Sequence, residues 1–140
     1  MANAAALYTP QVLALAASLA EWPWDDELPL QASARSKSCG SAVSLGLATD
    51  AGGRITNIGL KTHACAIGQA AAAIFAGSAV GQNLTEIAAA DRDIRAWLSG
   101  KALRPSWPGL DLLEPARSYP ARHAAIMLTW QAVRDLLPTR

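Results

Sequence analysis

Two runs of alternating apolar and polar residues, 43–47 and 55–62, flank a turn signal at residues 50–53, Asp-Ala-Gly-Gly. A period of two is typical of half-buried β-strands, and a glycine-containing turn between two such runs indicates a hairpin. Residues 28–34 alternate more loosely and are predicted as a first strand. The pattern therefore predicts a three-stranded antiparallel sheet. Its main apolar positions are Val43, Leu45, Leu47, Ile58 and Leu60.

The hairpin brings two residues with reactive side chains together. If Thr49 lies opposite Arg54, then Cys39 falls opposite Ala64, one residue before Cys65. Directly opposed side chains on such a ribbon have Cβ atoms about 4.5–5.5 Å apart. The two cysteines of the chain are therefore predicted at the same end of the ribbon, close enough to share a metal ion or to form a disulfide.

Helix signals mark four further segments. The clearest start is Thr9-Pro10, where a capping hydroxyl precedes a proline at the first helical position. The segment after Cys65 consists mainly of small residues, which let a helix pack closely on a sheet. The four predicted helices start at Thr9-Pro10, Cys65, Leu84 and Tyr119-Pro120, and they end before Trp22, near Gly77, at Leu98 and near Leu137.

The third helix carries signals at both ends, with Asn83 or Thr85 as its cap and Gly100 behind it. Residues 101–119 contain several prolines and are predicted as a loop with one helical turn at 110–113. Together these elements predict an α+β fold in one domain, residues 1–140, with helices packed on one face of the sheet.

Composition narrows the class of protein. Hydrophobic residues make up 51% of the 140 residues and charged residues 16%, which excludes a disordered chain. Lys plus Arg number 12 and Asp plus Glu 11, so charge gives no reason to expect nucleic acid or a membrane as partner. The N-terminus lacks a basic region and its apolar run 12–20 is short, so we expect neither a signal peptide nor a span, and a cytoplasmic location. In such a reducing compartment, two cysteines indicate thiols or metal ligands rather than a structural disulfide.

The candidate chemistry gathers around Cys65. A cysteine at a helix N-terminus feels the positive end of the helix dipole, which favours the thiolate that binds metal or attacks sulfur. His63 lies two residues earlier, on the same face if the segment is extended, and His123 lies early in the last helix. Cys39, Cys65 and one histidine would make a three-ligand site for zinc or an iron–sulfur cluster, with Ser41 or a partner's group as the fourth ligand.

Simpler interpretations of the same residues stay open. Isolated cysteines also occur as small buried hydrophobes, and both histidines also suit surface or packing positions. The tryptophans lack the interleaved basic residues of a base-stacking surface. Segment 50–54 is too short for a phosphate-binding loop and precedes a strand rather than a helix.

The motifs resemble those of the NifU/IscU-type iron–sulfur cluster scaffolds. Ser38-Cys39-Gly40-Ser41 precedes the hairpin, and Lys61-Thr-His-Ala-Cys65-Ala-Ile follows it with a helix of small residues. Residues 119–132 resemble the SufU branch of that family. The resemblance implies a SufE/NifU-like fold and a non-enzymatic scaffold that binds a transient iron–sulfur cluster or zinc through Cys39 and Cys65. It also implies that Cys65 accepts sulfur from a cysteine desulfurase, and that apo iron–sulfur proteins accept the cluster.

The chain departs from the family pattern at several positions. The aspartate two residues after the first cysteine is Ser41, the third cysteine is Ala125, and the lysine before it is Ala124. The Leu-Pro-Pro-Val-Lys segment through which some members meet a chaperone is also missing. His123 is a substitute ligand on local geometry alone. The departures open a second hypothesis, a degenerate member that acts as a protein-binding module or passes persulfide from Cys65 without a bound cluster.

Overall fold

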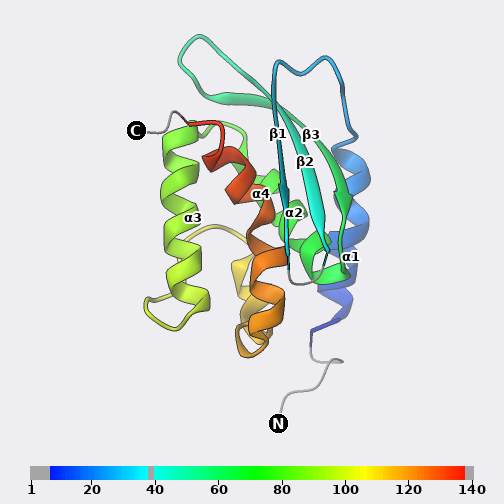
Figure 1. Ribbon diagram of the computed structural model, residues 1–140, viewed down its shortest axis with the longest axis vertical. Coiled ribbons are helices and arrows are strands. Elements are labelled where there is room, and N and C mark those ends of the chain that lie inside the picture. The colour runs from blue at the N-terminus through cyan, green and yellow to red at the C-terminus, as the bar shows by residue number, and fades with distance from the viewer. Residues whose placement is uncertain (1–6, 38–39, 138–140) are drawn as a thin grey trace.

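The computed structural model describes residues 7–37 and 40–137 and consists of one three-stranded antiparallel sheet with helices on one face (Figure 1). The strands are adjacent in chain order, which confirms the predicted α+β class and sheet. The strands are β1 (Leu30–Arg35), β2 (Ala42–Thr49) and β3 (Ile55–His63), and the α-helices of the described residues are α1 (Pro10–Ala17), α2 (Ala66–Ala79), α3 (Leu84–Leu98) and α4 (His123–Arg134).

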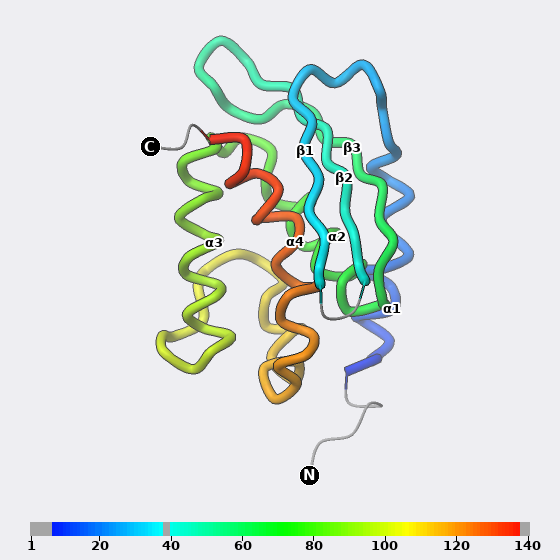
Figure 2. The backbone as a smooth tube through the Cα atoms, in the orientation of Figure 1, coloured from blue at the N-terminus to red at the C-terminus, as the bar shows by residue number. Residues whose placement is uncertain are grey.

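The helices form a layer in the order α1, α2, α4, α3 (Figures 1 and 2). In this layer α4 packs on β1 and β2, α2 contacts β3, and the two outer helices each pack on an inner one. Within the described residues, every helix is too short or too polar to cross a membrane.

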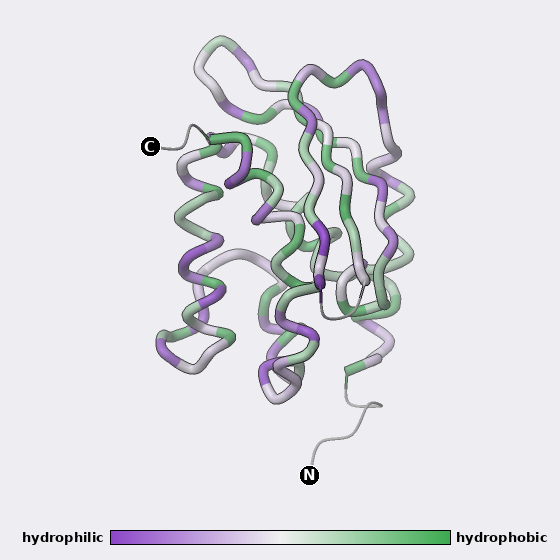
Figure 3. Tube along the Cα trace, in the orientation of Figure 1, coloured by the Kyte–Doolittle hydropathy of each residue, from purple (hydrophilic) through white to green (hydrophobic). Residues whose placement is uncertain are grey.

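Alternation along β2 gives the sheet two distinct faces. Val43, Leu45 and Leu47 are buried, as their spacing predicts, while Ser44 and Ala48, which point to the other face, are partly exposed. Figure 3 shows the result as hydrophilic and apolar stretches that follow one another along the strands, with a hydrophilic lower end on β1. The apolar face lies against the helices, and the other face carries the polar side chains.

The register of the β2–β3 hairpin differs from the predicted one. Thr49 pairs with Ile55 rather than Arg54, and beyond an irregularity at Ala48 the shift grows to two residues, so that Ala42 pairs with His63. The cause is the side chain of Asp50, whose Oδ1 accepts hydrogen bonds from the backbone N–H groups of residues 52 and 54 and widens the turn. The predicted pairing of Cys39 lies outside the described residues.

The segment after α3 is more regular than expected. It contains a 3₁₀-helix, η3 (Leu110–Ser118), rather than a single turn at 110–113. Its buried residues are Leu110, Leu113 and Ala116, and this spacing of three matches the three residues per turn of a 3₁₀-helix. A search for the α-helical period of 3.6 residues misses such a pattern.

Some helix ends lie where the capping residues in the sequence predict them, and others do not. Thr9 caps α1, Asn83 caps α3 in a capping box with Glu86, and Gly100 follows α3 with a positive φ. The last helix begins with a 3₁₀ turn, η4 (Pro120–Arg122), and α4 ends at Arg134 rather than near 137. Likewise α2 continues to Ala79, past the end predicted near residue 77.

Two paired glycines let a loop cross the polar face of the sheet. Gly46 lies opposite Gly59, and segment 22–28 passes over both. The backbone N–H of Leu60 donates to the carbonyl of Trp22 at 2.9 Å. A Cβ added at Gly59 would lie 2.9 Å from the carbonyl oxygen of Pro23, which is closer than real Cβ atoms come to a neighbour. The glycine pair therefore makes this close approach possible.

We expect Gly59→Ala to lower the free energy of unfolding by about 1–3 kcal/mol, because the new methyl group meets backbone that cannot turn aside. Gly77→Ala is the matched control, since nothing lies within 4 Å of its added Cβ and alanine favours the helix by up to about 1 kcal/mol. Urea denaturation measures both. Equal stability of the Gly59→Ala variant and the parent chain would contradict the prediction.

Candidate functional site

Cys65 lies between the end of β3 and the start of α2. It is the N-cap residue of the helix, with an extended backbone (φ −64°, ψ 167°), and its thiol makes no capping hydrogen bond. The side-chain amide of Gln69 donates to the carbonyl of Ala64 at 2.9 Å, and the N–H of Gln69 donates to the carbonyl of Cys65. The thiol is free and half-buried, so the backbone around it is held while the sulfur remains available.

A small polar cavity of about 240 Å³ opens beside this thiol. It lies at the end of the sheet where Ala42 pairs with His63. The cavity also borders Gly40 and Ser41, and the N–H of Ser36 donates to the carbonyl of Ser41 at 2.8 Å. The cavity is lined by Gly40, Ser41, Thr62, His63, Ala64, Cys65 and Gln69.

Three of the five predicted site residues share this cavity. Ser41, which is buried, His63, which is exposed, and Cys65 all line it. Cys39 precedes Gly40 in the sequence and lies outside the described residues, so its role as a ligand stays a prediction. The cavity thus brings Ser41, His63 and Cys65 together, and their roles as ligands stay predictions.

His123 lies in a different cavity. Its Nε2 is 3.2 Å from the carbonyl oxygens of both Ala116 and Arg117, an arrangement in which the ring N–H donates to the backbone. The side chain lines a hollow of about 350 Å³ between the end of α3 and the start of α4. Binding a metal beside Cys65 through Nε2 would cost His123 these hydrogen bonds. The other lining residues are Arg95, Leu98, Ser99, Ala124 and Met127.

The position of the family's third cysteine lies against the first turn of α2. Ala125 is buried, and its Cβ is 3.4 Å from where a Cβ on Gly68 would be. Gly68 is three residues after Cys65, so the start of α4 covers the helical turn that begins at that thiol. Sequence reasoning missed Gly68 as a site residue, because a glycine in a run of small residues gives no chemical signal.

The described residues do not form a complete metal site. Among residues 7–37 and 40–137, no group of three His, Cys, Asp or Glu side chains is placed to hold a metal ion. Cys65 and His63 line the cavity as two donors. A protein-bound metal or cluster there needs Cys39, or a group from a partner, to complete its coordination.

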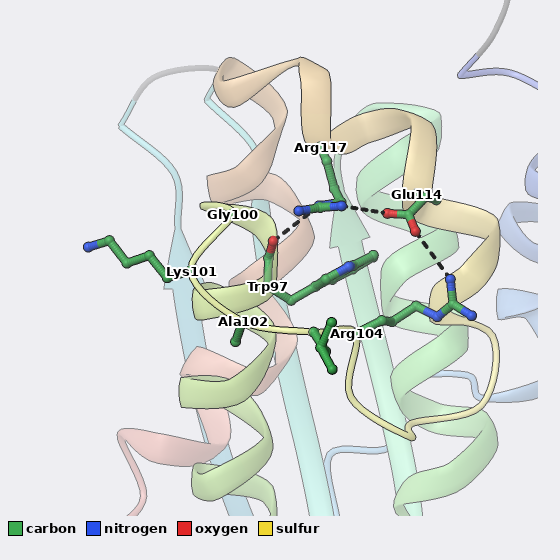
Figure 4. A pocket seen from close by; sticks show the side chains of 8 residues that line it. Trp97, Gly100, Lys101, Ala102, Arg104, Glu114 and Arg117 are labelled. Carbon is green, nitrogen blue, oxygen red and sulfur yellow. Dashed lines mark hydrogen bonds and ion pairs between the residues drawn. The ribbon is translucent and has the colours of Figure 1, made fainter.

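A larger hollow, of about 610 Å³, lies at the end of α3 and is lined by different side chains (Figure 4). Glu114 accepts from Arg104 and from Arg117, both at 3.2 Å, and the guanidinium of Arg117 lies over the ring of Trp97. These residues satisfy one another, and no cysteine or histidine is among the described residues that line the hollow. The candidate chemistry therefore belongs to the smaller cavity.

Comparison with known proteins identifies the family. The sequence model of the family described as the NifU-like N-terminal domain matches residues 22–124, so the chain belongs to the NifU-like family. A NifU-like protein (N-terminal part) from Brucella abortus, whose name describes it as nitrogen-fixing, has 30% identity and a TM-score of 0.84, over 94% of this chain and 92% of that one. None of the curated proteins compared with the chain matches it.

A second solved structure shows the same fold at lower identity. It is FiSufU from the thermophile Fervidobacterium islandicum AW-1, a candidate iron–sulfur cluster assembly scaffold of the SUF system. The identity is 19% and the TM-score 0.83, over 96% of this chain and all of that one. The predicted resemblance to the NifU/IscU type is thereby confirmed, and the likeness to FiSufU is a likeness of fold.

We expect Ala125→Cys to strengthen zinc binding by about tenfold or more, because it adds a thiol over the turn that starts at Cys65. Ala124→Cys is the matched control, since Ala124 is exposed and lines the hollow beside His123 instead. Competition with a chromogenic chelator measures the affinity. Equal gains in the two variants would show that position 125 does not face the Cys65 cavity.

Proposed function

We propose that this chain is an iron–sulfur cluster assembly scaffold that accepts sulfur on Cys65 and holds a nascent cluster, or zinc, between Cys65 and Cys39. The observation that carries the proposal is the free, half-buried thiol of Cys65 at the start of α2, in a polar cavity shared with His63. Membership of the NifU-like family supports it.

The sulfur step needs a thiolate and a donor with a persulfide. In that step the Cys65 thiolate attacks the outer sulfur of the donor's persulfide, a new S–S bond forms on Cys65, and the donor's S–S bond breaks. The donor leaves as a thiolate, so no external oxidant or reductant is consumed. A pyridoxal-phosphate-dependent cysteine desulfurase supplies such a persulfide, and we propose it as the partner.

The cargo is held by the side chains around the cavity. Cys39 and Cys65 are the proposed thiolate ligands, His63 is a further donor that lines the cavity, and Ser41 or a partner's group completes the site. His123 would join only if it released the carbonyls of η3. The assembled cluster passes to apo iron–sulfur acceptor proteins, and the chain itself catalyses no turnover. We propose the cytoplasm as the compartment, because the thiols must stay reduced.

A second candidate function follows from the small ligand set. Ala125 stands where a third cysteine would be, and the described residues form no group of three ligands. A chain of this kind can accept persulfide sulfur on Cys65 and pass it on with no bound cluster, or can act as a protein-binding module alone. The two candidate functions differ in whether metal is retained.

The test is anaerobic reconstitution with iron and sulfide, together with metal analysis of the freshly purified chain. We expect thiolate-to-iron absorption or about one zinc per chain in the parent, and loss of both in Cys65→Ser and Cys39→Ser. His63→Ala and His123→Ala form a matched pair that tests the third ligand. We expect the first to lose most of the metal and the second to retain it, because only His63 lines the cavity.

Incubation with cysteine and a desulfurase, followed by mass spectrometry, separates the alternatives. Persulfide on Cys65 without retained metal would favour the sulfur relay over the scaffold. Neither persulfide nor metal, in a chain that remains folded, would leave only the protein-binding module.

A further inference from the structure

Half of the polar face of the sheet is uncovered. Segment 22–28 crosses the end where Gly46 pairs with Gly59, and the open half lies toward the Cys65 cavity. Two rows of paired residues make up this open half. They are Arg35–Ala42–His63 and Ser33–Ser44–Lys61.

This open half is basic. Strands β1, β2 and β3 contain no Asp or Glu, whereas Arg35 and Lys61 stand exposed on their polar face, with Lys37 just beyond β1. Among the described residues none of these three cations forms an ion pair, although the ammonium of Lys61 lies 6.0 Å from the ring centre of Trp24. Exposed like charges without partners leave a positive potential over the surface.

The acidic side chains near this surface lie on its covered half. Segment 25–27, Asp-Asp-Glu, belongs to the loop that crosses Gly59, and Asp26 accepts a hydrogen bond from the indole of Trp24. The acidic loop meets the basic half at Trp24, whose ring lies beside the ammonium of Lys61. A partner with one acidic patch would be attracted by Arg35, Lys37 and Lys61 and repelled by segment 25–27.

The basic half borders the candidate site directly. His63 belongs to the outer row of the sheet and also lines the cavity of Cys65. A protein seated on Arg35 and Lys61 would therefore lie beside the thiol. By contrast, Arg104 and Arg117 at the end of α3 are both paired with Glu114, so they add less free charge to a docking surface.

We propose that the basic half of the sheet, Arg35, Lys37 and Lys61, is the surface on which the cysteine desulfurase docks through an acidic patch beside its persulfide. This inference rests on the proposed function, because it assumes that Cys65 receives sulfur from a donor protein. Complementary charge aligns the two proteins before the sulfur atoms meet, and it raises the association rate more than the final affinity.

The experiment measures association of the full chain with the pyridoxal-phosphate form of the desulfurase from the same genome, by stopped-flow fluorescence at low salt. Arg35→Glu and Lys61→Glu are each expected to slow association by about tenfold, and the double variant more. Arg92→Glu makes the same charge change on an exposed position of α3, away from the sheet, and is expected to change the rate less than about twofold. In about 0.5 M salt the association rates of the parent and the four variants should converge.

Two further measurements separate this inference from the proposed function. Zinc content and persulfide formation with sodium polysulfide, which needs no docking, should be unchanged in Arg35→Glu and Lys61→Glu. If the parent takes up metal and sulfur but both reversals bind the desulfurase like Arg92→Glu, the docking surface is wrong and the function stands. If the parent chain does not bind the desulfurase at all, the proposed docking surface is wrong. If the reversals slow binding of an apo-ferredoxin but not of the desulfurase, the surface belongs to the cluster acceptor and the proposal is overturned.

Discussion

The close packing of α2 sets the distances between the other parts of the molecule. Most of its buried residues are alanine or glycine, so neighbouring elements approach almost to its backbone. A Cβ on Gly109 would be only 3.1 Å from the side chain of Ile74, and one on Gly68 only 3.4 Å from Ala125. Phe75 is the large exception, and it fills the space between Trp107 and Trp130 with ring centres 5.9 and 5.6 Å away. Close packing, together with the hydrogen bond from the Trp107 indole to the carbonyl of Ile74, holds this helix and therefore positions Cys65 at its start.

The same packing explains how the chain keeps the family's architecture with fewer ligands. Ala125 is buried directly against Gly68, and its methyl group takes part in no polar network. The polar contacts that join α3 to α4 are made by other residues. Buried Asp91 of α3 accepts a hydrogen bond from Arg95 and forms an ion pair with Arg134 of α4. The fold is therefore stabilised independently of the candidate site, and the site residues can vary without unfolding it.

Sequence reasoning predicted most of the fold, because the signals involved are local. The alternation of Val43, Leu45 and Leu47 and the cap at Asn83 depend only on neighbouring residues. The hairpin register was wrong because the Asp50 side chain bonds backbone that periodicity does not include. Of the candidate site residues, Ser41, His63 and Cys65 line one cavity because they lie at the same end of one hairpin. The separate cavity of His123 depends on how α3 meets α4, which no spacing along the chain reveals.

A small ligand set suits a protein that must give its cargo away. Each thiolate added to a site strengthens metal binding, and a cavity that closes a full set of protein ligands around a cluster also slows its release. Under the proposed function, Cys65 and Cys39 hold the cargo with His63 beside an exposed surface, so a partner's ligand can enter without displacing a third cysteine. Selectivity then depends less on coordination than on which protein reaches the cavity. Under the proposed docking surface, the positive charge of Arg35, Lys37 and Lys61 near the Cys65 cavity makes that choice by orienting the approach.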